Sequence, residues 1–97
     1  MGLMLISAGD LKRFTDRRRY VIVDLRSERE YSLGHFLGAV NIPYSKFDIN
    51  NITWGRTCVF YCDRGVHSIN LARKLSEQGI SAVAVATPYR EWGHRRL

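Results

Sequence analysis

The sequence lacks any long hydrophobic run, and this absence excludes a simple membrane span. Its longest apolar stretches extend over only about four to six residues, whereas a membrane-spanning helix needs about 20. Residues 1–6 contain neither the basic segment nor the cleavage site of a secretory signal, and Ile6 occupies a position where a myristoylation signal requires serine or threonine. With no targeting signal visible, we expect a cytoplasmic protein that does not associate with membranes.

Cysteine and histidine are scarce. The two cysteines, Cys58 and Cys62, are too few for a disulfide framework. Both belong to one extended segment, which would hold their Cα atoms about 13 Å apart, beyond the ~7 Å limit for a disulfide. The three histidines (His35, His67 and His94) form no zinc-ligand pair that could complete a site with them. We therefore expect free thiols, a reducing compartment and no bound metal.

Acidic residues are outnumbered by basic ones. The chain has 15 Lys and Arg against 9 Asp and Glu, which gives a net charge of +6. The basic residues form one dense run, Arg17–Arg19, and one pair, Arg95–Arg96, and neither alternates with aromatic residues as a surface for single-stranded nucleic acid does. We expect a general attraction to polyanions, but the sequence contains no motif for specific nucleic-acid recognition.

The length and composition indicate one globular domain. The 97 residues are 45% hydrophobic and 25% charged, which excludes disordered, collagen-like and coiled-coil proteins. The chain has no internal repeat, low-complexity segment or linker. We therefore predict a single domain over residues 1–97.

Short β-rich segments alternate with segments of helical character. Residues 20–25 are apolar almost throughout, as in a strand that is covered on both faces. The predicted strands are residues 3–6, 20–25, 38–43, 57–61 and 82–86. Helices are expected over residues 7–14, 27–33 and 67–78, with helical turns within 44–56 and after Pro88. This alternation predicts an α/β fold in which a small, open, mainly parallel sheet has helices on both faces.

Capping residues indicate where two of these helices begin and end. Ser27 and Glu30 have the spacing of a capping box, and Gly34 is expected to end the helix that they start. Ser7 and Asp10 have the same spacing, with aspartate in place of the usual glutamate or glutamine.

Cys62 has the position that a reactive thiol would need. It follows a predicted strand and begins a turn that leads directly into a helix, and ligands of open α/β sheets bind beyond the carboxyl ends of the strands. The amides at a helix N-terminus stabilise a thiolate, and Gly65 would allow the loop to curl around an anion. Arg64 and His67 add donors nearby. Cys62 is therefore a candidate nucleophile, the alternative being a buried strand cysteine, which is our interpretation of Cys58.

A set of motifs in a fixed order resembles the single-domain rhodanese-like sulfurtransferases. Together the motifs cover nearly the whole chain, and they place Cys62 where this family has its nucleophile. The matching segments are Val23-Asp24-Leu25-Arg26, Glu30-Tyr31, residues 34–43 and residues 59–68, followed by Ala72 and Trp92.

The resemblance implies a sulfurtransferase that forms a persulfide on Cys62. In this mechanism the thiolate accepts the sulfane sulfur of thiosulfate or a similar small anionic donor and passes it to a thiol, cyanide or a protein acceptor. No metal or organic cofactor is implied. The resemblance assigns persulfide binding to the backbone amides of the loop residues Asp63, Arg64, Gly65, Val66, His67 and Ser68.

The resemblance also suggests roles for side chains near the loop. Asp24, Arg26 and Glu30 would form a structural charge network below it, with direct substrate contact as the alternative for Arg26. His35 is expected to be a structural hydrogen-bonding residue rather than a general base.

Two features depart from the family pattern. His67 occupies a position where many members have arginine, which bears on thiosulfate preference. Thr87-Pro88-Tyr89 replaces a Gly-Gly-Tyr segment and could reshape one wall of the site.

Two other functions are alternatives to sulfur transfer on this fold. A phosphatase or arsenate reductase on the same fold would need a Cys-x5-Arg loop, and Ser68 occupies the arginine position. A rhodanese-fold module for protein interaction or regulation, without catalysis, is the alternative function.

Overall fold

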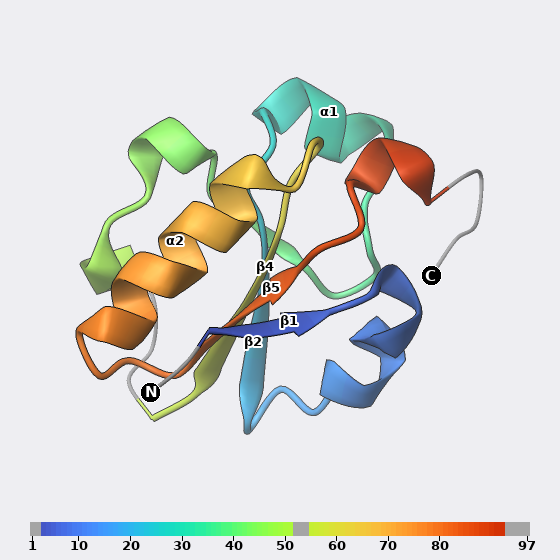
Figure 1. Cartoon of the computed structure of the whole chain (residues 1–97). Helices are drawn as coiled ribbons and strands as arrows, with labels where there is room; N and C mark the ends of the chain where they lie inside the picture. Colours follow the sequence, from blue (N-terminus) through green and yellow to red (C-terminus); the bar gives the residue numbers. More distant parts are fainter. Residues whose placement is uncertain (1–2, 52–54, 93–97) are drawn as a thin grey trace.

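Five parallel strands form one sheet in this computed structural model, which describes residues 3–51 and 55–92 (Figure 1). The order across the sheet is β1-β5-β4-β2-β3, so that β4 lies at the centre. The strands are β1 (Met4–Ile6), β2 (Tyr20–Asp24), β3 (Val40–Asn41), β4 (Thr57–Tyr61) and β5 (Ala82–Val85). The predicted α/β fold with a parallel sheet is therefore confirmed.

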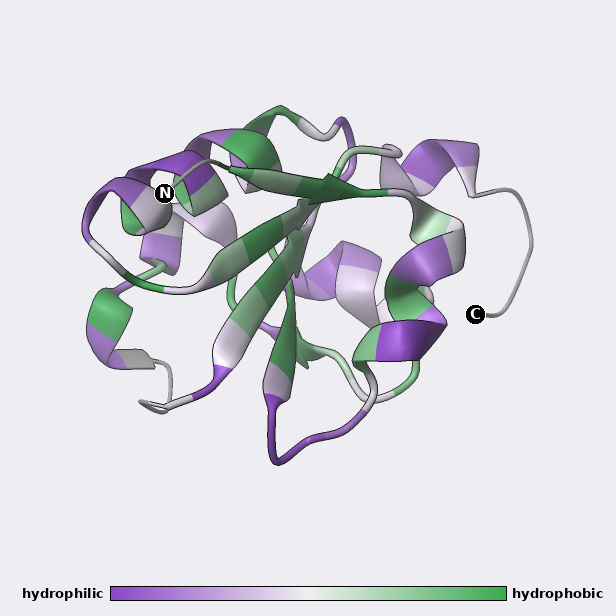
Figure 2. Ribbon diagram, turned by 60° about the horizontal axis from the view of Figure 1, so that its bottom comes forward, coloured by the Kyte–Doolittle hydropathy of each residue, from purple (hydrophilic) through white to green (hydrophobic). Residues whose placement is uncertain are grey.

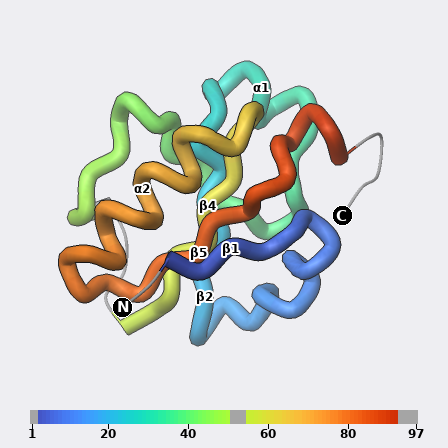
Figure 3. Tube along the Cα trace, viewed as in Figure 1, coloured from blue at the N-terminus to red at the C-terminus, as the bar shows by residue number. Residues whose placement is uncertain are grey.

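Helices cover both faces of the sheet, as predicted. In the described part of the chain two are α-helices, α1 (Glu28–Leu33) and α2 (Val66–Glu77). Four are short 3-10 helices: η1 (Ala8–Phe14), η2 (Tyr44–Lys46), η3 (Ile49–Asn51) and η4 (Tyr89–Glu91). α2 lies on one face, with the segment that contains η2 and η3 running beside it, while η1 and η4 contribute to the other face (Figures 1 and 3). Every helix within the described residues is too short or too polar to cross a membrane.

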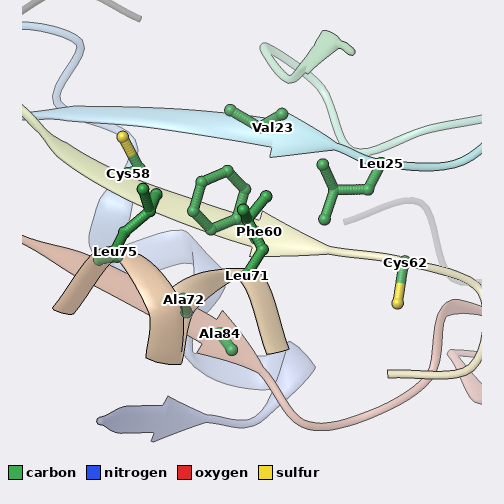
Figure 4. Packing of buried hydrophobic residues seen from close by; sticks show 10 residues of the cluster. Val23, Leu25, Cys58, Phe60, Cys62, Leu71, Ala72, Leu75 and Ala84 are labelled. Atoms are coloured by element: carbon green, nitrogen blue, oxygen red, sulfur yellow. The ribbon is translucent and has the colours of Figure 1, made fainter. Parts of the chain in front are cut away.

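The core under α2 joins the helix to the middle of the sheet. Leu71 and Leu75 extend from α2 toward Val23 of β2 and Phe60 of β4 (Figure 4). The ribbon coloured by hydropathy shows mainly hydrophobic strands, and helices in which hydrophilic and hydrophobic residues alternate (Figure 2). Burying each of these leucines contributes roughly 1.5–3 kcal/mol, so this packing fixes α2, and with it the loop that precedes α2, against the sheet.

The register of β2 and β4 brings two functional segments together. Asp24 and Tyr61, the last residues of these strands, are register partners. Because the strands are parallel, the chain leaves both at the same edge of the sheet. The loop between β4 and α2 and the turn before α1 therefore meet there.

Only the strand predicted over residues 57–61 has the predicted bounds; β1 and β5 are each one residue shorter than predicted, and β2 and β3 differ for reasons seen in the structure. β2 ends at Asp24, because its carboxylate accepts the backbone N–H of Arg26 at 2.8 Å and turns the chain. β3 is only Val40–Asn41, because Ala39 still belongs to a turn that is closed by a hydrogen bond to Phe36, and Pro43 has no N–H group to continue the ladder.

Two helices also differ from prediction. η1 is a 3-10 helix rather than an α-helix: the Asp10 carboxylate accepts the N–H of Ser7 at 3.1 Å, while the N–H of Asp10 donates to the Ser7 carbonyl at 3.0 Å. α2 begins at Val66, one residue before the predicted start, because the cap is Gly65 in the left-handed conformation.

Candidate active site

Two backbone amides converge on the sulfur of Cys62. Its Sγ accepts the N–H of Gly65 at 3.1 Å and the N–H of Ser68 at 3.4 Å. Cys62 directly follows β4, and Gly65 and Ser68 lie at the first turn of α2. The residue is only 4% exposed. The sulfur is thus held where unpaired amides and the positive end of a 12-residue helix favour negative charge.

Ser68 ties this loop to the rest of the fold. Its hydroxyl lies 3.6 Å from Cys62 Sγ, in line to accept the thiol proton, and it donates to the carbonyl of Gly65 at 3.0 Å. The same oxygen lies 3.4 Å from the carbonyl of Val85 in β5. Because Ser68 is fully buried, these contacts fix the distance between the sulfur and the start of α2.

Gly65 meets two requirements that only glycine satisfies together. Its φ of 84° lies in the left-handed region, and a Cβ placed on it would lie 3.1 Å from the carbonyl oxygen of Ala86. A side chain would therefore push the loop away from the strand end that it packs against. The close approach of the two amides to Cys62 depends on this residue.

We expect Gly65→Ala to lower the free energy of unfolding by about 2–3 kcal/mol, of which about 1–2 kcal/mol is the cost of the left-handed conformation and the rest is overpacking. Urea denaturation measures the change. Gly79→Ala is the matched control, since Gly79 has a φ of +80° but open space around its Cβ position. Equal losses in the two variants would contradict the close contact with Ala86.

The sulfur lies at a cavity of about 630 Å³. The loop residues Asp63, Arg64, Val66 and His67 line this cavity together with Cys62, so the structure brings the exposed part of the predicted loop around one space. The remaining wall comes from the turn before α1, from α1 itself and from the segment after β3: Leu25, Arg26, Ser27, Glu30, Pro43, Tyr44 and Ser45.

One wall of the cavity is aromatic. The rings of Tyr44 and His67 are stacked with centroids 4.0 Å apart and an interplanar angle of 2°. This contact sets the orientation of His67, and sequence reasoning missed Tyr44. The pair joins two segments that are far apart in the chain, so no local spacing could have predicted it.

Asp24 and Arg26 form a buried ion pair at the wall of the cavity, which Arg26 lines. Arg26 Nη2 lies 2.8 Å from Asp24 Oδ2, and Arg26 Nε lies 3.1 Å from Oδ1. Tyr61 donates its hydroxyl to Asp24 at 2.7 Å and accepts the N–H of Phe36 at 3.1 Å. Burial opposes the charge on Arg26, but the hydrogen bonds and the charge of Asp24 outweigh it and raise the pKa of Arg26. Burial, and then the charge of Asp24, raise the pKa of the Tyr61 phenol, so the phenol remains a donor.

Arg26 is also held by the chain segments around it. Its Nη2 donates to the carbonyl of Gly34 at 2.6 Å, and its guanidinium carbon lies 3.7 Å from the ring centroid of Tyr89. Tyr89 comes from the Thr87-Pro88-Tyr89 segment that departs from the family pattern, and its N–H donates to the carbonyl of Cys62 at 3.0 Å. That segment therefore packs onto both Arg26 and the Cys62 backbone.

The structure places Glu30 outside the Asp24–Arg26 pair. Its carboxylate accepts the backbone N–H of Ser27 at 3.2 Å and the hydroxyl of Ser27 at 3.0 Å, which closes the capping box of α1. His35 makes local contacts, since its Nδ1 lies 2.7 Å from the carbonyl of Tyr31 and its ring stacks on the Tyr31 ring at 3.6 Å.

The two cysteines are both free but lie in different surroundings. Cys58 lies in the core below α2, whereas Cys62 lies just beyond the end of β4 (Figure 4). Burial raises the pKa of the Cys58 thiol to about 11, with a partial opposing effect from the charge of Arg56. Cys58 therefore stays protonated at neutral pH, and Cys62 is the thiol that lines the cavity. Among the described residues, no three His, Cys, Asp or Glu side chains gather closely enough to hold a metal ion.

Comparisons with known proteins agree with this geometry. Residues 7–94 match the family model of the rhodanese-like domain. The thiosulfate sulfurtransferase GlpE of Shewanella oneidensis is 31% identical over 80 residues, which cover 80% of this chain and 79% of that protein. The crystal structure of SSP1007 from Staphylococcus saprophyticus is 28% identical, with a TM-score of 0.80 and 94% of each chain covered.

Other relatives are longer than this chain, some of them several-fold. A tRNA sulfurtransferase of Thermoplasma acidophilum is 40% identical over 62 residues, which are 64% of this chain but 13% of that protein. The chain spans 22% and 63% of two further curated relatives that it matches. The resemblance seen in the sequence is nevertheless confirmed by the match over residues 7–94 and by the shared fold. The chain belongs to the rhodanese-like domain family.

Proposed function

We propose that this domain is a sulfurtransferase that carries sulfane sulfur as a persulfide on Cys62. The Cys62 thiolate attacks the outer sulfur of thiosulfate, the S–S bond of the donor breaks, and sulfite leaves with the bonding electron pair. A thiol, cyanide or a protein acceptor then attacks the outer sulfur of the persulfide, and the Cys62 thiolate is regenerated. Both steps are displacements at sulfur, so the cycle requires no metal or organic cofactor.

The convergence of two amides on one sulfur atom is the observation that carries this proposal. The sulfur has to carry negative charge to attack the donor, and the persulfide carries negative charge afterwards. The N–H groups of Gly65 and Ser68 lie 3.1 and 3.4 Å from Sγ without any rearrangement. Donors fixed in advance around a developing charge are usually the largest single contribution to catalysis.

Side chains that line the cavity are placed to contact the outer sulfur atom of the persulfide. An S–S bond of about 2 Å would place the outer sulfur beyond Sγ, toward the cavity that Arg64 and His67 line. Arg64 and His67 are both exposed, whereas Arg26 is committed to Asp24. We therefore assign anion contact to Arg64 and His67, and a structural role to the Asp24–Arg26 pair.

Steady-state kinetics with thiosulfate and cyanide test the proposal. Because sulfur passes through a covalent intermediate, thiocyanate formation should follow ping-pong kinetics, with parallel double-reciprocal lines. Replacing cyanide with a small thiol should preserve this pattern. Absence of turnover with every donor would favour a non-catalytic interaction or regulatory module.

His67→Arg is expected to raise kcat/KM for thiosulfate by about tenfold. A guanidinium is always charged and presents a planar fork of donors, whereas an imidazole presents one donor at a time when neutral. A hydrogen bond to a charged group is worth about 1.5–3 kcal/mol, which corresponds to about tenfold or more in rate. His67→Gln serves as the uncharged control. A His67→Arg variant with unchanged kcat/KM would show that this side chain does not contact the donor.

We also propose that the domain acts in the cytoplasm. Two free thiols and a nucleophile that must remain reduced between cycles fit the cytoplasm. The proposed partners are a small anionic sulfur donor and a thiol, cyanide or protein acceptor, and residues 1–97 are proposed to act as one domain.

A further inference from the structure

A second cavity lies at the opposite end of β4 from Cys62. It has a volume of about 440 Å³ and shares no lining residue with the cavity at Cys62. Arg56, which lines it, directly precedes β4, and Cys62 directly follows this strand. At about 3.3 Å per residue, the two positions are about 20 Å apart. The second cavity is therefore separate from the sulfur chemistry.

The short β3 leaves one edge of β2 open at this cavity. β3 pairs with Val23 and Asp24 of β2, so the preceding stretch Tyr20–Ile22 has no neighbour in β3 and lines the cavity instead. Leu37 and Val40 line the other side and are 81% and 44% exposed. The cavity thus has an apolar side beside an open strand edge.

Four arginines gather around this end of the sheet. Arg17–Arg19 lead into β2, and the N–H of Thr57 donates to the carbonyl of Arg19 at 2.9 Å. Arg56 donates from Nη1 to the carbonyl of Arg17 at 3.1 Å. Figure 2 shows a strongly hydrophilic loop leading into β2. Within residues 3–51 and 55–92, one of these four arginines forms an ion pair: Arg18 pairs with Asp16 at 3.5 Å.

Arg56 carries an unused hydrogen-bond donor. Its Nε is buried and has no hydrogen-bond partner among the described residues. A buried donor without a partner costs about 1–3 kcal/mol. Arg56 and the exposed Arg17 both line the cavity, so an anion bound there would meet two guanidinium groups.

We propose that Arg17 and Arg56 bind a phosphate group in this cavity, and that the phosphate belongs to a nucleic-acid backbone. Guanidinium groups bind phosphate oxygens in a two-pronged geometry. Arg18, which pairs with Asp16, and Arg19, which lies over the Tyr20 ring, are exposed on the same loop. Their charge beside the cavity favours a chain of phosphates over a single ion. The contacts are with the backbone, so the binding is independent of base sequence.

Fluorescence anisotropy with a short RNA duplex tests this proposal across a range of salt concentrations. The double variant Arg17→Gln/Arg56→Gln is compared with Arg29→Gln/Arg73→Gln, which removes two exposed arginines on α1 and α2 and changes the net charge equally. We expect the first variant to weaken binding by about tenfold or more and to reduce the slope of log affinity against log salt by about two. The control pair should lose much less affinity.

Equal losses in the two double variants would show diffuse attraction and would overturn the proposal. The single variant Arg17→Gln changes only an exposed side chain, so it should not disturb folding. We expect it to reduce the slope of log affinity against log salt by about one. Inorganic phosphate forms a separate arm of the experiment, in which its binding to the protein and to the double variant is read directly by isothermal titration calorimetry. If inorganic phosphate binds through Arg17 and Arg56 while RNA binding is unchanged in the double variant, the ligand is a small phosphate and the nucleic-acid assignment is wrong.

Discussion

Replacing Cys62 with alanine is expected to reduce thiocyanate formation by about four orders of magnitude or more, because the covalent route disappears with the nucleophile. The same replacement at Cys58 should leave turnover within about a factor of two, since its thiol lies in the core below α2 and away from the cavity. Cys58→Ala is expected to cost some stability through the small cavity it creates, typically about 1 kcal/mol.

Each of these two variants removes one thiol group. Comparing their turnover therefore shows which of the two thiols reacts. Initial rates under saturating thiosulfate and cyanide measure the effect, with circular dichroism to show that each variant is folded. Substantial turnover in Cys62→Ala, or loss of turnover in Cys58→Ala that remains folded, would contradict the assignment of the nucleophile.

Asp24→Ala is expected to lower the free energy of unfolding by about 3–5 kcal/mol. The carboxylate is fully buried and accepts from the Arg26 side chain and from the Tyr61 hydroxyl. Removing it leaves a buried guanidinium without its counter-charge, and this uncompensated charge dominates the loss. Urea denaturation followed by circular dichroism measures the change.

A surface pair provides the control for this prediction. Asp16 pairs with Arg18 at 3.5 Å in an exposed position, so Asp16→Ala should cost no more than about 1 kcal/mol. A double variant that also replaces Arg26 with methionine should regain much of the stability lost in Asp24→Ala, because it removes the unpaired charge. If Asp24→Ala and Asp16→Ala cost the same, the buried pair is not a structural element of the site.

The central strands and α2 could be predicted from sequence because their patterns are local. β2 and β4 read as apolar runs bounded by charged or turn residues, and Gly79 follows the end of α2. The segment 44–51 was less predictable: it forms two single-turn 3-10 helices, η2 and η3, which leave no hydrophobic period to detect.

Some features of the candidate site could also be predicted from the sequence, and others could not. The amides that reach Cys62 follow from a strand–loop–helix pattern and a glycine at position 65, which are visible in the sequence. The link between Asp24 and Tyr61 depends on strand register, and the packing of Tyr44 on His67 depends on a chain crossing, neither of which is encoded in local spacing. The contacts of Glu30, in contrast, could be predicted from the sequence. Its capping-box spacing to Ser27 accounts for its hydrogen bonds to that residue.

Intact-mass spectrometry of the protein after incubation with thiosulfate tests the central claim most directly. The account predicts a gain of one sulfur atom per chain, located on Cys62 by peptide mapping and removed by cyanide. The Cys58→Ala variant should gain the same mass, and the Cys62→Ala variant should gain none. A protein that stays unmodified, or that carries the added sulfur on Cys58, would contradict the account.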